Sequence, residues 1–267
     1  MPNRPRRLRR VARSRALSCQ ALFYVDGFQP GSLVAKGHVL SLDGAMVVPP
    51  PSDRLLPPLI GDAAPLFTAR STRGELSLES YRGRWVLFLS HPADFTPVCT
   101  SEIMAFARLH AQFHALDCDI LALSVDSLYA HLAWIQMIAE RHGVEVPFPL
   151  IEDPTMAIAR AYGMIHADSR DSATVRASIV IDPGGIVRAT TCYPLIAGRN
   201  AAEHLRLVTA LREADRTGGL APENWQPEAP MLRPPPTSVA EMADEPPGSG
   251  WLLRSVQPGK RPSGRRA

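Results

Sequence analysis

The stretch that decides the fold covers residues 85–106 and reads WVLFLSHPADFTPVCTSEIMAF. Its first residues form a nearly continuous apolar run, which is typical of a buried strand. Apolar residues then recur at helical spacing over residues 98–116, so a helix follows. Thr96 suits the N-cap of this helix and Pro97 its first position. The stretch therefore predicts a strand, a short loop and a helix with Cys99 in its first turn.

Apolar runs and helical periodicity alternate from about residue 59 to residue 215, which is the signature of an α/β domain. The expected strands cover residues 85–90, 120–125, 177–181 and 186–192. The expected helices cover residues 98–116, 128–142, 155–162 and 201–212. Asp182-Pro183-Gly184-Gly185 suits a tight turn, so the last two strands are predicted to form an antiparallel hairpin. The expected fold is a mixed central sheet flanked by helices.

Composition divides the chain into a basic extension over residues 1–45, the α/β domain over 46–217 and a proline-rich C-terminal extension over 218–267. The first part holds eight basic residues and two acidic ones, which gives it a net charge of +6. Since the whole chain has a net charge of +3, the remainder has a net charge of −3. An acidic body argues against a nucleic-acid-binding core. No run approaches the roughly 18 apolar residues that cross a bilayer. We therefore expect neither nucleic acid nor membrane as a partner.

The basic extension has several interpretations. Its arginine-rich, acid-poor start is typical of a transit peptide, which would make the protein organellar or exported. A disordered tail or an artefactual upstream start are the alternatives, and with them we predict a cytoplasmic protein. Ser18-Cys19 is only a weak candidate for a lipoprotein cleavage site, because arginines precede it in place of an apolar signal region.

The cysteines are few and widely separated, which favours a reducing compartment over a disulfide scaffold or a paired-cysteine zinc site. There are four: Cys19, Cys99, Cys118 and Cys192. An unperturbed thiol is only a few per cent ionised at pH 7. The first turn of a helix stabilises a thiolate through its dipole and its unpaired N–H groups. A reactive Cys99 also needs a nearby cation, for which Arg176 and Arg199 are the candidates.

Pro92, Thr96 and Cys99 match the pattern Pro-x-x-x-Thr/Ser-x-x-Cys, and at these residues the sequence resembles the peroxiredoxin family. The blocks RASIVIDP at 176–183 and ENWQP at 223–227 resemble its one-cysteine branch and archaeal relatives. The resemblance runs from about residue 59 to about residue 251. It implies a thioredoxin-like fold and a thiol-dependent peroxidase that reduces hydrogen peroxide and organic hydroperoxides. It also implies antioxidant defence without a cofactor or a metal.

The resemblance assigns a role to each site residue. Cys99 is the nucleophile that becomes a sulfenic acid, and Thr96 hydrogen-bonds the thiolate and the peroxide. Pro92 shields the site. Arg176 polarises thiolate and substrate, and Arg199 resembles the second active-site arginine of the family.

Two features depart from other branches of the family. Residues 248–253 lack the resolving cysteine that some members carry there, so we predict a one-cysteine mechanism with an external thiol such as thioredoxin or glutathione. Cys118 and Cys192 are expected to be small buried strand residues, with resolution by either as the alternative. At 82–86 the chain reads RGRWV in place of a Gly-Asp-Ser-Trp-Gly element. Since Arg84 replaces the serine, phospholipase activity is unsupported.

Three histidines stay open to interpretation. His91 either tunes the site, where it would bind substrate with Arg176 and Thr96, or is a packed residue at a strand end. His110 and His114 stand at i and i+4 and could share a metal. No third ligand has recognisable spacing, so solvated helix residues are the preferred interpretation.

Three classes of function compete. The preferred one is the peroxidase, and a peroxide sensor or redox-regulated chaperone that uses Cys99 is the alternative. A disulfide oxidoreductase would need a cysteine at position 102, which is Glu102.

The C-terminal extension is too short for its own core and carries several apolar residues. We therefore expect it to act as an arm in a homodimer or a ring of dimers.

Overall fold

The computed structural model describes residues 33–35, 38–40, 46–47, 57–165, 169, 171–243 and 251–256. The chain separates into two compact units, Met1–Arg54 and Leu55–Ala267. In the first unit, β1 (Leu33–Ala35), β2 (His38–Leu40) and β3 (Met46–Val47) form an antiparallel sheet in that order. The remainder of the expected extension over residues 1–45 lies outside the described residues.

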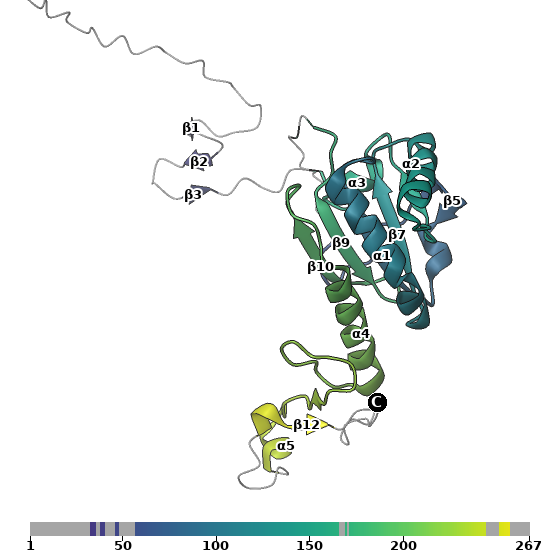
Figure 1. Ribbon diagram of the computed structural model, residues 1–267. Helices are drawn as coiled ribbons and strands as arrows, with labels where there is room; N and C mark the ends of the chain where they lie inside the picture. Colours follow the sequence, from purple (N-terminus) through teal and green to yellow (C-terminus); the bar gives the residue numbers. More distant parts are fainter. Residues whose placement is uncertain are drawn as a thin grey trace, which may run out of the picture. The chain divides into compact units, whose positions relative to one another are not determined.

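A seven-stranded mixed sheet forms the centre of the second unit, in the order β10-β9-β6-β7-β8-β4-β5 (Figure 1). Its strands are β4 (Thr68–Ser71), β5 (Gly74–Ser77), β6 (Trp85–Ser90), β7 (Cys118–Ser124), β8 (Leu150–Glu152), β9 (Arg176–Ile181) and β10 (Val187–Tyr193). Strands β6, β7 and β8 run parallel, whereas β9 is antiparallel to both β6 and β10. The predicted mixed sheet is confirmed.

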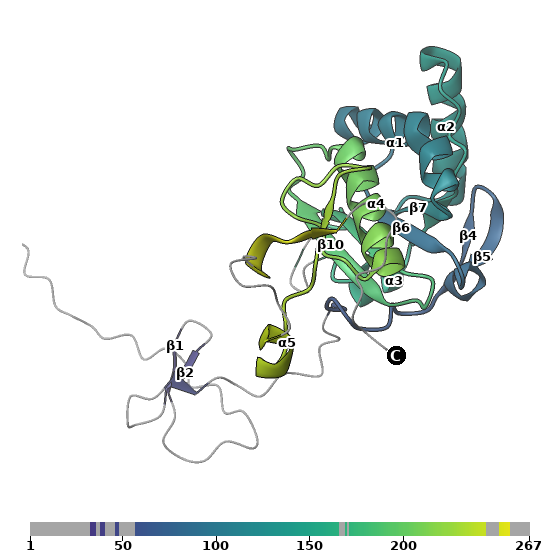
Figure 2. The ribbon, with the colours of Figure 1, turned by 90° about the horizontal axis from the view of Figure 1, so that it is seen from below.

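Helices cover both faces of this sheet. They are the 3₁₀ helix η1 (Leu78–Tyr81) and the α-helices α1 (Pro97–Ala115), α2 (Leu128–His142), α3 (Ala157–Ala161) and α4 (Ala201–Thr217). Strand β6 shows why, because its side chains alternate between two cores. Trp85, Leu87 and Leu89 pack with α1, α2 and α4, while Val86 and Phe88 pack with η1 and α3. On the first face, α1 and α4 lie side by side (Figure 2).

The predicted turn between the last two strands is confirmed. Asp182 N–H donates to Ile186 O at 2.9 Å, and Gly185 N–H donates to Asp182 O at 2.8 Å. Gly185 has φ +78°, which glycine adopts without a steric penalty. The resulting hairpin pairs β9 with β10 along its length and makes β10 an edge strand.

The start of the C-terminal extension packs on α4. Trp225 is 3% exposed and lies against Ala210 and Met231. Arg206 Nη1 donates to Trp225 O at 2.9 Å, which ties the extension to the helix. Farther along, β11 (Met231–Leu232) pairs with β12 (Ser255–Val256), and α5 (Val239–Ala243) and the 3₁₀ helix η2 (Trp251–Leu253) lie between them in the sequence. Across the described ranges, every helix is too short or too polar to cross a membrane.

Candidate active site

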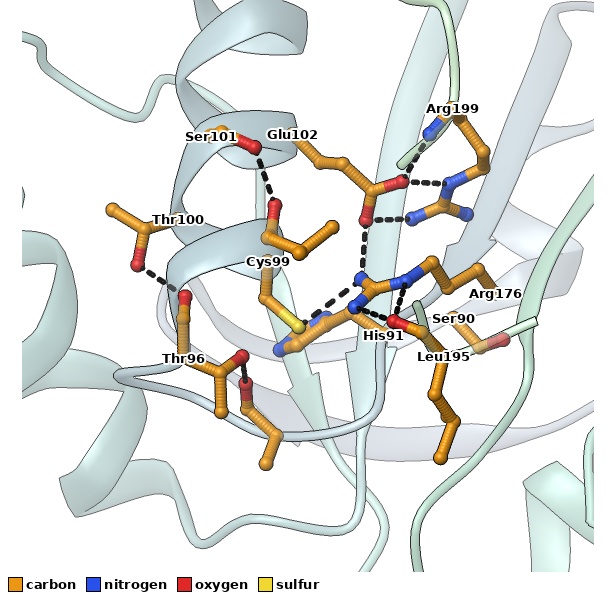
Figure 3. A network of polar contacts seen from close by, with 12 residues as sticks. Ser90, His91, Thr96, Cys99, Thr100, Ser101, Glu102, Arg176, Leu195 and Arg199 are labelled. Atoms are coloured by element: carbon orange, nitrogen blue, oxygen red, sulfur yellow. Dashed lines mark hydrogen bonds and ion pairs between the residues drawn. The ribbon is translucent and has the colours of Figure 1, made fainter. Parts of the chain in front are cut away.

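The site lies where β6 ends and α1 begins, next to the start of β9 (Figure 3). Ser90 holds these strands together, because its Oγ donates to Val175 O at 2.6 Å and accepts from Ala177 N at 3.0 Å. These two bonds surround Arg176 in the sequence. They fix the backbone from which its side chain reaches toward α1.

Cys99 is the third residue of α1, and its side chain is fully buried. Thr96 is the N-cap, as predicted, and its carbonyl accepts from Thr100 N at 2.9 Å. The amides of the first turn precede this bond and have no acceptor within the helix. Their partial positive charge forms the positive end of the helix dipole, and this end lies at the Cys99 sulfur.

The Thr96 hydroxyl does not cap the helix. Its Oγ1 donates to Ala93 O at 2.9 Å across the loop between β6 and α1. The proton is therefore used, and the lone pairs of Oγ1 can accept a hydrogen bond from a ligand. A direct role toward thiolate and peroxide stays a prediction, as does the shielding role of Pro92, which is buried in this loop.

Arg176 is the cation that contacts the sulfur. Its Nη1 lies 3.2 Å from Cys99 Sγ and donates to Glu102 Oε2 at 2.7 Å. Its Nε and Nη2 donate to Leu195 O at 3.1 and 2.8 Å. A planar guanidinium bound on both edges has little freedom to turn. The charge is thus held beside the sulfur in one orientation (Figure 3).

Arg199 lies behind this first arginine and contacts Glu102. Its Nε and its backbone N–H donate to Glu102 Oε1 at 2.8 and 2.7 Å, and its Nη2 donates to Oε2 at 3.1 Å. Its Nη1 donates to Ala177 O at 2.7 Å. Arg199 thus contacts Glu102 and not the sulfur. It holds the Glu102 carboxylate in place, and that carboxylate in turn positions Arg176.

Glu102 joins the two arginines and is itself almost fully buried. Burial raises the pKa of Glu102, but hydrogen bonds and charge from Arg199 outweigh this and leave the pKa below its usual range. The carboxylate therefore stays ionised between two cations. Gly198 allows the loop before Arg199 to approach α1, since a Cβ there would lie 3.2 Å from Val98 Cγ1.

His91 belongs to a second buried network. Its Nε2 is 2.8 Å from Asp94 Oδ1, and Asp94 Oδ2 is 2.7 Å from His131 Nδ1 on α2. His131 Nε2 lies 3.2 Å from Ile151 O. His91 is thus the packed, hydrogen-bonded residue of one interpretation, yet its ring is also drawn beside Cys99 in Figure 3.

His91, Asp94 and His131 are also the group of potential metal ligands that the described residues bring together. Their contacts of 2.7 and 2.8 Å are hydrogen-bond distances, with each carboxylate oxygen facing a different ring. Ligands of one ion would instead converge on a common point about 2 Å from each atom. The donor set thus fits a hydrogen-bonded network better than a metal centre. His110 and His114 have no third ligand near them in the described part of the chain.

The other cysteines have contrasting surroundings. Cys118 opens β7 and is fully buried, as expected. Burial and the charge of Asp119 raise the pKa of Cys118 to about 12, so its thiol stays protonated. The expectation that Cys192 is buried is wrong, because this residue is exposed on the edge strand β10. Both are free thiols, and Cys19 lies outside the described residues.

Arg84 stands at the position of the serine in the Gly-Asp-Ser-Trp-Gly element with which residues 82–86 were compared. Its Nε donates to Asp119 Oδ2 at 2.5 Å and its Nη2 to Oδ1 at 3.2 Å. The side chain therefore joins the residue before β6 to β7 through an ion pair, and it offers no nucleophilic group at this position.

Sequence reasoning misses Asp94 and His131 and gives Glu102 too small a part. Asp94 stands three residues after His91, and its only signal in the sequence is its place within the loop block. His131 lies on the buried face of α2 with Trp134 and Ile138, which is a signal for a polar residue that needs a partner. Glu102 suits the helix dipole, whereas in the structure it is the carboxylate that aligns two arginines.

A buried cysteine at a helix N-terminus, beside a fixed arginine, defines a protein of thiol-based redox chemistry. Comparison with known proteins gives the family. Residues 60–190 match the model of the AhpC/TSA family, and residues 210–245 match that of the C-terminal domain of 1-Cys peroxiredoxin. A peroxiredoxin of Aquifex aeolicus is 45% identical over 195 residues, which cover 69% of this chain and 88% of that protein. Peroxiredoxin 2 of Thermoplasma acidophilum is 42% identical, covering 74% of this chain and all of the relative.

Solved structures agree. The yeast mitochondrial 1-Cys peroxiredoxin is similar with a TM-score of 0.64 and 38% identity, over 68% of this chain and 90% of that one. A mutant form of peroxiredoxin 6 from Arenicola marina gives a TM-score of 0.67 and 29% identity, over 76% and 99%. The chain belongs to the peroxiredoxin family and has its thioredoxin-like fold. It is therefore a thiol-dependent peroxidase, of a family that works on hydroperoxides with thiol reductants such as thioredoxin or glutathione.

Proposed function

We propose that this peroxiredoxin reduces hydrogen peroxide and organic hydroperoxides by a one-cysteine mechanism in which Cys99 alone reacts with the peroxide. The observation that carries the proposal is the contact of 3.2 Å between Arg176 Nη1 and the buried Cys99 Sγ. A fixed cation and the helix N-terminus both favour the thiolate over the thiol. The same groups stabilise negative charge on an oxygen bound beside the sulfur.

The reaction follows from these groups. The Cys99 thiolate attacks the terminal oxygen of the hydroperoxide, so that an S–O bond forms while the O–O bond breaks. The sulfur is oxidised to a sulfenic acid, and the peroxide is reduced to an alkoxide or hydroxide that takes a proton from water. Arg176 and the first-turn amides stabilise the departing oxygen. An external thiol then displaces water from the sulfenic acid, and a second thiol releases Cys99.

Resolution by an external thiol is supported by the surroundings of the other cysteines. Cys118 is buried with a pKa of about 12, so it supplies almost no thiolate to attack a sulfenic acid. Cys192 is exposed on β10, the strand at the far side of β9 from β6. The relative whose structure concerns thiol resolution through the glutathione and thioredoxin systems points to the same reductants here.

Mass spectrometry after one equivalent of peroxide tests the mechanism. We expect sulfenic acid on Cys99 and, after addition of glutathione or thioredoxin, a mixed disulfide at the same residue. An internal disulfide from Cys99 to Cys118 or Cys192 would contradict the one-cysteine mechanism. Multiple turnovers with either thiol would separate a peroxidase from a peroxide sensor or redox-regulated chaperone, which need not turn over.

We further propose a homodimer, or a ring of dimers, in which the segment after Gly218 reaches the partner. Val239, Met242, Leu252 and Leu253 on this segment are exposed apolar residues. Such residues in one short stretch favour a protein contact. Light scattering on a chain that lacks residues 219–267 is the test. A smaller number of subunits is expected, and an unchanged number of subunits would contradict the proposal.

A further inference from the structure

The loop over residues 194–199 holds both arginines of the site in place. Its Leu195 O accepts from Arg176, and its last residue, Arg199, donates to Glu102 (Figure 3). The loop connects the end of β10 with the start of α4. A contact that joins the two ends of the loop therefore also steadies Arg176 beside the sulfur.

His204 makes such a contact. It is the fourth residue of α4 and is 2% exposed. Its Nδ1 is 2.8 Å from Asn200 O at the helix start, and its Nε2 is 3.3 Å from Thr191 Oγ1 on β10. The contact with Thr191 joins residues 13 positions apart, one on each side of the loop. This contact between His204 and Thr191 is a clasp across the base of the loop.

The partners of His204 fix its tautomer. Asn200 O can only accept a hydrogen bond, so Nδ1 carries a proton and donates it. The neutral ring then has a bare lone pair at Nε2, and the Thr191 hydroxyl donates to this lone pair. A second proton on the ring would occupy the lone pair and point at the Thr191 oxygen, so the existing bond would have to break. The clasp therefore depends on a neutral His204.

The charges around His204 differ in sign. Burial lowers the pKa of His204, the bond to Asn200 O raises it, and the charge of Arg199 lowers it. Glu203 on α4 and Glu102 on α1 raise it. The net pKa lies below the ordinary value of 6.5. His204 is therefore neutral at pH 7 and takes up a proton only in acid.

The remaining neighbours of His204 do not compensate a charge on it. Its ring lies against Phe106 of α1, with the centroids 5.6 Å apart and the planes at 77°, and β10 presents the Thr191 hydroxyl. In the described part of the chain its ring nitrogens bond to no carboxylate, whereas His131 is bonded to Asp94. The ring also lies near the positive end of the α4 dipole, which disfavours a cation. A charged His204 would thus be buried without a counter-ion.

We propose that the clasp between His204 and Thr191 is an acid-sensitive switch of the peroxidase. A proton from the solvent binds Nε2 of His204, the bond to Thr191 breaks, and the base of the loop opens. Leu195 O then holds Arg176 less firmly beside Cys99, so the reaction with peroxide slows. The inference goes beyond the proposed function, because it concerns how the rate responds to acid and not which residue reacts.

His204→Gln removes the titration and keeps the clasp. A glutamine amide stays neutral, and its oxygen reaches the position of Nε2, where it can accept from Thr191. Hydrogen exchange of the loop, followed by mass spectrometry, reports the opening directly. The amides of Ala197 and Arg199 are the probes, because each donates a hydrogen bond in the folded protein.

The two proteins should differ only in acid. We expect wild type and His204→Gln to exchange alike at pH 7.5. At pH 5.5 the loop of wild type should exchange about fivefold faster than that of the variant, the factor that one lost hydrogen bond represents. Each comparison is made at a single pH, so the intrinsic exchange rate is the same for both proteins. Equal exchange at pH 5.5 would overturn the inference.

The single-turnover rate with hydrogen peroxide should follow the loop. Other groups of the site titrate in wild type and in His204→Gln alike, so the difference between the two pH profiles belongs to His204. Between pH 7.5 and pH 5.5 wild type should lose about fivefold more of its rate than the variant. His142→Gln, at the exposed end of α2, is the matched control and should behave as wild type. Identical profiles for wild type and His204→Gln would show that His204 is not a switch.

Thr191→Val opens the clasp from the other side without a change of charge. Valine resembles threonine in shape but has no hydroxyl group to donate to Nε2. At pH 7.5 the loop of this variant should already be less protected from exchange than that of wild type, and a fall to pH 5.5 should add little. Circular dichroism checks that the variant is folded. A folded variant with a fully protected loop at pH 7.5 would overturn the inference.

Nitrogen-15 NMR of wild-type protein follows His204 itself and needs no variant. At pH 7.5 we expect the neutral tautomer with its proton on Nδ1, and a titration midpoint below 6.5. A proton on Nε2 at pH 7.5, or a midpoint at or above 6.5, would overturn the inference even if every variant failed to fold. The exchange and NMR readouts need no turnover. An internal disulfide from Cys99 would therefore refute the one-cysteine mechanism and leave this test intact.

Discussion

Cys99 and Cys118 differ in their neighbours and not in their burial. Both are 0% exposed and both belong to the same core cluster between the sheet and α1, α2 and α4. Cys99 lies in the first turn of a helix, 3.2 Å from the guanidinium of Arg176. Cys118 lies at the start of a strand beside the carboxylate of Asp119, and its pKa rises to about 12. Burial alone makes a thiol inert, so the local charge decides which cysteine can be a nucleophile.

Replacement of the nucleophile itself should have the largest effect. Cys99→Ser should abolish peroxide consumption and leave the fold intact, because a serine hydroxyl is not appreciably ionised at neutral pH. Turnover is measured from peroxide loss with a thiol donor, and folding by circular dichroism. If about a tenth or more of wild-type turnover remained, the assignment of Cys99 would be wrong.

Removal of the cation should make Cys99 more like Cys118. Arg176→Met should slow peroxide reduction by more than about tenfold, since it removes stabilisation from the thiolate and from the departing oxygen. Arg84→Met is the matched control, because Arg84 pairs with Asp119 away from the sulfur. Alkylation of Cys99 against pH, measured with the rate, checks the cause. An unchanged curve and rate would remove Arg176 from the mechanism.

Loss of the carboxylate between the arginines should act mainly on stability. Glu102→Gln leaves Arg176 and Arg199 buried with too little negative charge, which costs about 3–5 kcal/mol when a buried pair is broken. Since the folded-state pKa of Glu102 is lowered, its stabilising effect is present above the ordinary pKa and is lost as the pH falls below it. The free energy of unfolding in urea is measured at pH 7 and at pH 4. The loss of this free energy between pH 7 and pH 4 should be smaller for the variant than for wild type.

Glu203→Gln is the control for this prediction, because Glu203 pairs with Arg206 on the exposed side of α4. An exposed pair of this kind contributes about 0–1 kcal/mol. If both glutamate variants lost the same small amount of stability, Glu102 would not hold the two arginines in place.

Substitution of Cys118 should leave peroxidase activity unchanged and should alter only the free energy of unfolding at alkaline pH. Cys118→Ser and Cys192→Ser should both keep peroxidase activity with an external thiol. In the unfolded chain the Cys118 thiol ionises near the ordinary cysteine pKa of 9.0, whereas in the folded protein its pKa is about 12. The unfolded state thus binds fewer protons between these values, and wild-type stability should fall there by about 1.4 kcal/mol per pH unit. Cys118→Ala should flatten this slope, and an unaltered slope would contradict the raised pKa.

Elements with a strong period are predictable from the sequence. The predicted bounds of β6 and α2 agree with the structure, and Gly143 ends α2 in a left-handed conformation that suits a helix C-cap. Strand β8 escapes prediction because three residues are too few to show a period. The hairpin of β4 and β5 escapes it because its polar, half-exposed residues do not alternate clearly. Helix α4 extends to Thr217, beyond the predicted end at residue 212.

The site is predictable where its residues are close in sequence. Thr96, Pro97 and Cys99 follow from local helix chemistry, whereas the bond of Arg199 to Glu102 joins residues 97 positions apart. The pairing of Asp94 with His131 spans 37 positions and depends on how α2 packs. The exposure of Cys192 is not predictable, because a strand period cannot show which strand forms the edge of the sheet. Distant contacts of this kind come from the topology and not from any local pattern.

The bond from Arg176 to Leu195 determines which positions of the loop before α4 can be substituted. The acceptor is a main-chain carbonyl, so substitution of residue 195 changes the side chain and leaves the bond in place. Leu195 and Ile196 are exposed, at 46% and 90%, and should tolerate many replacements, including an engineered attachment site for a fluorophore. Gly198 should not, because even a methyl group there would press on Val98 in the first turn of α1. The constraint on the arginine is thus carried by the course of a loop, and related chains can preserve it while sharing few of the loop's side chains.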